Sequence, residues 1–176
     1  MIMDGLLFFD GSVASNGSLT PTSVNSGTTF TSATPQDSAN IIDVSNIAAN
    51  ANAQGRDIGI GDDPSLQIEC LITATFTGTG ATMAVEIQTA PDGGSGTPGS
   101  WTVLETTPAI GVANLTAGTE LFRVPMPLGV QKFLKLTYVV GTANMTAGAI
   151  VSSVVIDRQA LGPLMGYKSG FSNQYS

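Results

Sequence analysis

Residues able to do acid–base or nucleophilic chemistry are scarce in this sequence. Histidine is absent from all 176 residues, which removes the usual general base, the most common metal ligand and any triad built on imidazole. A carboxylate pair such as Glu69 and Glu86 is the remaining option, but both residues alternate with apolar neighbours. We therefore expect both on solvent-facing sides of strands, where nothing distinguishes an acid from a base. The sequence favours a protein that is not an enzyme, with no catalytic residues and no cofactor.

Two short motifs resemble ligand sites. Residues 94–99 match the phosphate-binding pattern G-x-G-x-x-G, but that pattern requires a following helix, and this stretch leads into a β-like segment. We interpret it as a hairpin loop. Asp57, Asp62 and Asp63 offer oxygen ligands for a cation such as Ca²⁺, though without EF-hand spacing. A turn that precedes the next strand is the alternative, and the residues alone do not decide between the two.

Four further side chains have both a structural and a functional interpretation. Cys70, the single cysteine, alternates with apolar residues and is interpreted as a buried small hydrophobe rather than a reactive thiol. Trp101 is interpreted as a core or hairpin anchor, with a sugar-stacking platform as the alternative. Lys132 and Lys135 are interpreted as solvated charges, with an acidic partner surface as the alternative.

Composition excludes several partners. Only 11% of residues are charged, and the formal net charge is -7, which disfavours binding to the phosphates of nucleic acid. Residues 1–10 are apolar but lack the basic start of a signal peptide, and Asp4 and Asp10 interrupt them. No apolar run approaches the ~20 residues of a membrane helix, so no membrane partner is expected.

The elements that must position these residues are strands, because the apolar residues recur at every second position. Residues 66–76 and 83–88 alternate in this way, and the glycine-rich turn between them predicts an antiparallel hairpin. Similar segments follow at 101–106, 120–124, 133–140 and 147–157, with shorter ones at 41–44 and 110–115. One helical turn is plausible within 44–54. The pattern predicts an all-β fold, an antiparallel β-sandwich that is jelly-roll-like.

Three regions follow from this pattern. Residues 1–40 are expected to form an N-terminal segment and a Ser/Thr/Asn-rich arm or loop, residues 41–157 the sandwich, and residues 158–176 a C-terminal arm. Both arms carry apolar side chains without an evident core, which is typical of a partner surface. The candidate interface residues are Leu6, Leu7, Phe8, Phe9, Leu161, Leu164, Met165, Tyr167, Phe171 and Tyr175.

Several stretches together resemble a known family. These are the opening MIMDGLLFF, the segment DIGIGDD at 57–63, TTPAI at 106–110 and VIDRQ at 155–159. In them the chain resembles the jelly-roll capsid cement (decoration) proteins of short-tailed bacteriophages. It departs from that family in the length of the polar stretch at 11–40.

The resemblance implies a structural virion protein, made in the host cytoplasm and bound to the capsid exterior. Its partners would be the major capsid protein and itself, as a homodimer or a homotrimer, and it would stabilise the head by bridging capsid subunits. A carbohydrate-binding or adhesin-like β-sandwich module is the alternative function, because Trp101 is able to stack on a sugar.

Overall fold

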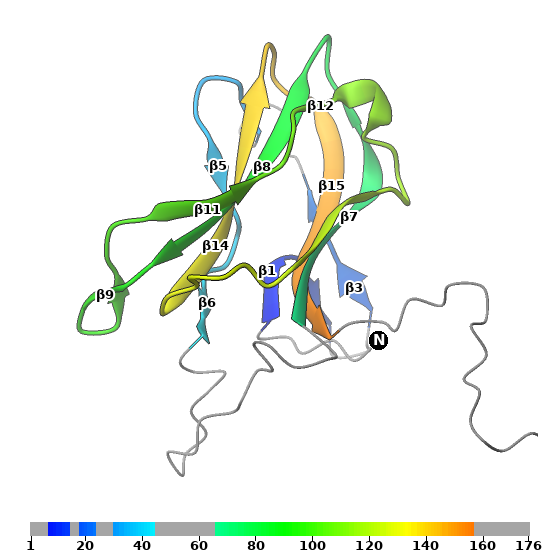
Figure 1. Cartoon of the computed structure of the whole chain (residues 1–176). Helices are drawn as coiled ribbons and strands as arrows, with labels where there is room; N and C mark the ends of the chain where they lie inside the picture. The colour runs from blue at the N-terminus through cyan, green and yellow to red at the C-terminus, as the bar shows by residue number, and fades with distance from the viewer. Residues whose placement is uncertain (1–6, 15–17, 24–29, 45–65, 157–176) are drawn as a thin grey trace, which may run out of the picture.

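The structure is a computed structural model, and it describes residues 7–14, 18–23, 30–44 and 66–156. Within these residues it is an all-β protein in which two antiparallel sheets face each other (Figure 1). The alternation of apolar and polar residues explains this arrangement, because each strand buries one face against the opposite sheet.

The first sheet has the order β1-β15-β7-β13, and a short strand, β4, also pairs with β15. Its strands are β1 (Phe8–Asp10), β4 (Thr22–Ser23), β7 (Leu66–Thr77), β13 (Glu120–Pro125) and β15 (Ala147–Ile156). All of these pairs are antiparallel.

The second sheet has the order β11-β8-β14-β5, with β6 also paired to β14 and β12 to β8. Its strands are β5 (Gln36–Asp37), β6 (Ile42–Asp43), β8 (Thr82–Ala90), β11 (Thr102–Thr106), β12 (Ile110–Gly111) and β14 (Phe133–Gly141). A 3-10 turn, η2 (Val112–Asn114), follows β12. Two small hairpins stand apart: β2 (Ser12–Val13) with β3 (Leu19–Thr20), and β9 (Asp92–Gly94) with β10 (Thr97–Pro98).

The strand orders are those of a jelly roll. From β7 onward the chain crosses from one sheet to the other at most connections, and only the stretch from β8 through β11 to β12 stays with one sheet. The result is two four-stranded layers, β1-β15-β7-β13 and β5-β14-β8-β11, as in a double Greek key. This confirms the predicted fold class.

The expected hairpin between residues 66–76 and 83–88 is wrong. β7 pairs with β13 and β15, whereas β8 pairs with β11, β12 and β14. The turn after Thr77 carries the chain from one sheet to the other, so the apolar sides of the two strands meet face to face. Two-residue periodicity shows which side of a strand is buried but not which strand lies beside it.

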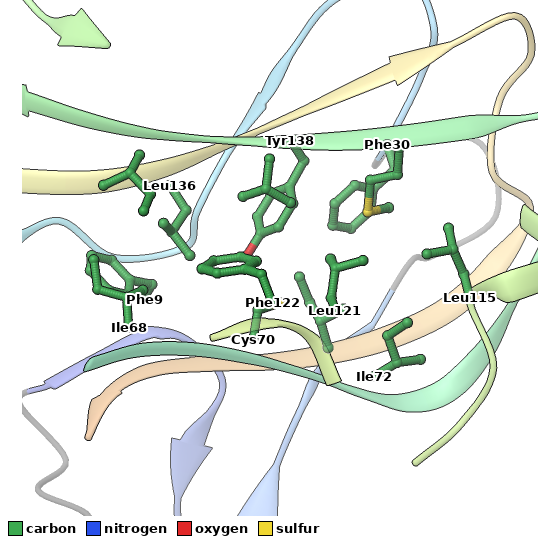
Figure 2. Close-up of a cluster of buried hydrophobic side chains, with 14 of the residues drawn as sticks. Phe9, Phe30, Ile68, Cys70, Ile72, Leu115, Leu121, Phe122, Leu136 and Tyr138 are labelled. Carbon is green, nitrogen blue, oxygen red and sulfur yellow. The ribbon is translucent and has the colours of Figure 1, made fainter. Parts of the chain in front are cut away.

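The core lies between the two sheets (Figure 2). β7 contributes Ile68, Cys70 and Ile72, and every second residue of β14 faces them from the other sheet: Leu134, Leu136 and Tyr138. All six are 0% exposed. Phe30 packs edge to face against Phe76 and Tyr138, with ring centroids 5.8 and 5.1 Å away. The interdigitated aromatic rings join segments that are far apart in the sequence.

The sandwich begins before residue 41, which corrects the expected boundary. β1 pairs with β15, β5 pairs with β14, and Phe9 and Phe30 belong to the core. Phe30 holds this place with a left-handed backbone, φ 60°, a conformation that a bulky residue adopts only when its surroundings compensate for the strain. Part of the expected N-terminal arm is therefore an integral part of the fold. The helical turn expected within 44–54 lies, from residue 45 on, outside the described residues.

Candidate binding surface

A buried carboxylate joins the two sheets. In β1, Phe8 pairs with Ser153 of β15 and Asp10 pairs with Ser152. The step from Phe8 to Asp10 covers two residues on β1 but only one on β15, which is a β-bulge. Because of this bulge, the consecutive residues Phe9 and Asp10 both point inward. The carboxylate Oδ2 of Asp10 accepts hydrogen bonds from the Tyr138 hydroxyl at 2.5 Å and the Ser152 hydroxyl at 2.7 Å. Its Oδ1 accepts one from the backbone N–H of Ala39 at 3.0 Å.

This network is structural. Asp10, Tyr138 and Ser152 are at most 1% exposed, so no ligand reaches them from solvent. Burial raises the pKa of the Tyr138 hydroxyl well above its ordinary value and also raises that of the neighbouring Cys70 thiol. Both groups therefore stay protonated at neutral pH. The interpretation of Cys70 as a buried small hydrophobe is confirmed.

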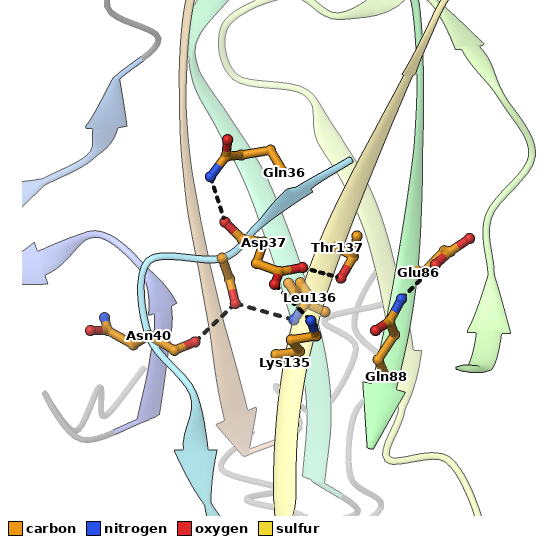
Figure 3. Close-up of polar contacts among 9 residues, drawn as sticks. Gln36, Asp37, Asn40, Glu86, Gln88, Lys135, Leu136 and Thr137 are labelled. Carbon is orange, nitrogen blue, oxygen red and sulfur yellow. Dashed lines mark hydrogen bonds and ion pairs between the residues drawn. The ribbon is translucent and has the colours of Figure 1, made fainter. Parts of the chain in front are cut away.

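A second polar cluster lies on the outer face of the β11-β8-β14-β5 sheet (Figure 3). The Lys135 ammonium donates to Asp37 Oδ2 at 2.7 Å, and the Thr137 hydroxyl donates to Asp37 Oδ1 at 2.8 Å. Burial alone would raise the pKa of Asp37, but the hydrogen bonds from Lys135 and Thr137 outweigh it and hold the pKa below its ordinary value. Asp37 thus remains a carboxylate that accepts hydrogen bonds.

Trp101 completes this cluster and is not a core residue. Its side chain is half-buried and lies outside the hydrophobic cluster between the sheets. The Lys135 ammonium lies over the indole, 4.5 Å from the ring centroid, within the range of a cation–π contact. Alternation explains the placement, since Val103 and Lys135 both pair with Gln88 on the outer side of the sheet and Trp101 precedes Val103 by two residues.

Glu86 and Gln88 extend the same face along β8. The Gln88 amide donates to Glu86 Oε2 at 2.7 Å, and both side chains are half-buried. We refer to Trp101, Lys135, Asp37, Glu86 and Gln88 as the Trp101 platform. It gathers three strands and the residue before β11 into one surface that is partly aromatic and partly rich in hydrogen-bonding groups.

The two lysines differ in their surroundings. Lys132 forms an ion pair with Asp92 at 2.6 Å, and 26% of its side chain is exposed. Lys135 is only 8% exposed, so the interpretation as a solvated charge is wrong for this residue. A lysine on the outer face of a sheet becomes buried when neighbouring side chains cover it, and here Trp101 and Asp37 do so.

The carboxylates considered for catalysis do not meet. Glu69 pairs with Arg123 at 2.7 Å on β7, whereas Glu86 lies on β8 of the opposite sheet. Each belongs to the outer side of its own sheet, so the thickness of the sandwich separates them.

The glycine-rich stretch 94–99 forms part of the β9–β10 hairpin with positive φ at Gly94, Ser95 and Gly96. It leads to β11, as the interpretation as a hairpin loop requires.

Of the predicted interface residues, three are described. Leu7 is half-buried against the core, and Phe8 and Phe9 are 2% and 0% exposed. The expectation that these side chains lack a core is thus wrong for all three: Phe9 lies in the core, Leu7 packs against it, and Phe8 is buried. The others lie outside the described residues: Leu6, Leu161, Leu164, Met165, Tyr167, Phe171 and Tyr175, together with the acidic candidates Asp57, Asp62 and Asp63.

Sequence reasoning missed Asp37 and the burial of Lys135, because both depend on the non-local pairing of β5 with β14. The one available signal for Asp10 was an acid placed directly after two phenylalanines.

Among the described residues, no group of three or more Cys, Asp or Glu side chains is arranged to hold a metal ion. No helix in the described ranges is long and apolar enough to cross a membrane.

Residues 17–155 match the family described as Bbp16, while no curated protein matches the chain. The matched region runs from the β2–β3 connection into β15 and therefore includes most of both sheets. On this match over most of its length, the chain belongs to the Bbp16 family.

Proposed function

We propose that this protein is a non-catalytic component of a phage virion that binds the outside of the capsid and stabilises the head by bridging major capsid protein subunits. The observation that carries the proposal is the jelly-roll order of the two sheets in a member of the Bbp16 family. The name of that family suggests a phage protein, and the jelly roll is a recurrent fold of viral capsid proteins. The resemblance of four sequence stretches to capsid cement proteins supports the same role.

The distribution of polar groups supports a scaffold rather than an enzyme. The most deeply buried polar groups, around Asp10, bond to one another and hold the two sheets together. A sandwich stabilised in this way keeps its shape when its surface is loaded, which a bridging protein requires. Its bridging contacts are proposed to come from the terminal segments, including the apolar residues between 158 and 176.

Oligomerisation would strengthen such binding. A homodimer or homotrimer that engages several capsid subunits converts each later contact into an intramolecular one, so modest single contacts give tight decoration. The proposed site of action is the capsid exterior, after synthesis in the host cytoplasm.

The proposal is tested with DNA-filled heads from a phage in which this gene is deleted. Purified protein is added, and the temperature at which the heads release DNA is followed with a dye. We expect the release temperature to rise with added protein and to saturate. An unchanged release temperature at saturating protein would contradict the proposal.

A variant lacking residues 162–176 tests the proposed arm by co-sedimentation with the same heads. It should sediment with heads at reduced occupancy. Leu128→Ser, which removes an exposed apolar side chain between β13 and β14 (87% exposed), serves as the control and should bind normally. Normal occupancy of the truncated protein would exclude the arm from the capsid contact.

A further inference from the structure

The Trp101 platform has the construction of a stacking site for a neutral ligand with an apolar face. Lys135 is 8% exposed and lies 4.5 Å from the centre of the indole. The ammonium is fixed in turn by Asp37 at 2.7 Å. The indole therefore rests on a fixed support, and a rigid aromatic surface loses little conformational entropy when a ligand covers it.

Part of the Trp101 side chain remains exposed beside the fixed ammonium. The Lys135 ammonium lies over the ring, and the Trp101 side chain as a whole is half-buried, so part of the indole remains accessible to solvent. Val103, 46% exposed, follows on the same side of β11. A partly exposed indole with an exposed apolar neighbour thus lies at the start of β11 on the outer side of the sheet.

Hydrogen-bonding groups lie on the same outer side of the sheet as Trp101. Asp37 is 53% exposed and has a second lone pair on each carboxylate oxygen beyond those used by Lys135 and Thr137. Glu86 and Gln88 present further oxygens from β8. An aromatic face beside carboxylate and amide oxygens matches a pyranose ring, whose axial C–H groups pack on the negative face of the indole while its hydroxyls donate to the oxygens.

We propose that the Trp101 platform binds a neutral sugar unit of a polysaccharide by stacking on Trp101, with Asp37, Glu86 and Gln88 as hydroxyl acceptors. The charge of the platform selects the class of sugar. Asp37 and Glu86 carry two negative charges against the single positive charge of Lys135, which Asp37 already pairs. Uronic or sialic acids are therefore repelled and neutral pyranoses are accepted. This proposal does not depend on capsid binding.

Trp101 is the only tryptophan of the chain, so its fluorescence reports on this site alone. The full-length protein is titrated with neutral oligosaccharides, namely glucose, mannose, xylose and N-acetylglucosamine oligomers, and with acidic alginate and hyaluronan oligomers. We expect a saturable change in emission with at least one neutral series and no change with the acidic ones. No saturable change with any neutral series, or saturation only with the acidic ones, would overturn the proposal.

Variants separate stacking from general effects on the fold. Affinity electrophoresis in gels that contain the neutral polysaccharide should show about a tenfold loss of affinity in Trp101→Ala, the size of effect expected from one aromatic contact. Trp101→Phe should keep part of the retardation because a smaller ring remains. Leu19→Ser, at an exposed apolar position in another hairpin, should migrate like the parent protein. Equal retardation of the parent and Trp101→Ala would place the sugar elsewhere and refute the platform.

Discussion

At the scale of single residues, the buried carboxylate of Asp10 and its hydrogen-bond donors are the feature of this sandwich with the clearest consequence for stability. Asp10 is 1% exposed and accepts three hydrogen bonds, two of which come from hydroxyl groups on β14 and β15. A buried charge is costly unless it is fully bonded, so each donor around Asp10 contributes more to stability than an average hydrogen bond. The position of the bulge in β1 follows from this requirement, because it allows Phe9 and Asp10 to point inward together.

Removal of one donor should therefore destabilise the protein. Tyr138→Phe keeps the ring that packs against Phe30 but deletes the hydroxyl bonded to Asp10. We expect a loss of about 2 kcal/mol in the free energy of unfolding, seen as a lower urea midpoint with an unchanged slope. Thr73→Val, which deletes an exposed hydroxyl on β7, should stay within about 0.5 kcal/mol of the parent. Equal stability of the Tyr138→Phe variant would show that Asp10 does not need this donor.

The Asp37–Lys135 pair should make stability depend on pH. The pKa of Asp37 is lower in the folded protein than its ordinary value of 3.8, so its contribution is present above that value and is lost as the pH falls through the folded pKa. Because Lys135 is nearly buried but Asp37 is half exposed, we expect Asp37→Asn to cost about 1 kcal/mol near neutral pH. The difference from the parent should shrink below about pH 4.

Urea unfolding of both proteins from about pH 7 to about pH 3 measures this difference. Asp92→Asn breaks the more exposed pair with Lys132 and should change the stability less. A difference between parent and Asp37→Asn that is independent of pH would mean that packing around Lys135, and not the ion pair, is responsible.

At the scale of elements, the sequence predicted where the strands lie along the chain better than it predicted which strands pair with each other. The alternation from Leu66 to Phe76 and from Phe133 to Val140 corresponds closely to β7 and β14, because each strand turns apolar side chains toward the opposite sheet. In β14 the outer face is buried as well. Pairing was not predictable in the same way. The assignment of β7 and β8 to different sheets depends on contacts with β13, β14 and β15, which follow much later in the chain. β5, only two residues long, has too few residues to show a period.

β15 contains one position where the fit between the sheets is especially tight. Gly148 has φ 138°, and a Cβ at this position would overlap the ring of Phe76 in the core. Gly148→Ala should cost about 3 kcal/mol or more, because both the backbone and Phe76 would have to move. Gly111→Ala on β12 is the matched control, since nothing lies within 4 Å of its Cβ position. Thermal unfolding of the two variants compares them directly, and equal midpoints would show that Phe76 yields without cost.

At the scale of the whole molecule, composition and periodicity were sufficient for the all-β sandwich, whereas the candidate surface was not predictable. Trp101 and Lys135 are separated by more than thirty residues in sequence and meet only because β8 lies between β11 and β14. The N-terminal boundary was misplaced for a similar reason, since the polar stretch before residue 41 conceals Phe30, which enters the core. The Trp101–Lys135 contact and the burial of Phe30 both depend on tertiary contacts, and no local sequence motif indicates either of them.

The central claim is that this jelly-roll protein is a stoichiometric part of a virion surface. The most direct test is quantitative mass spectrometry of purified virions, with and without brief protease treatment of intact particles. We expect a fixed ratio of this protein to the major capsid protein, and cleavage of the protein on intact particles while the packaged DNA stays protected. Its absence from purified virions, or a ratio that varies between preparations, would contradict the account.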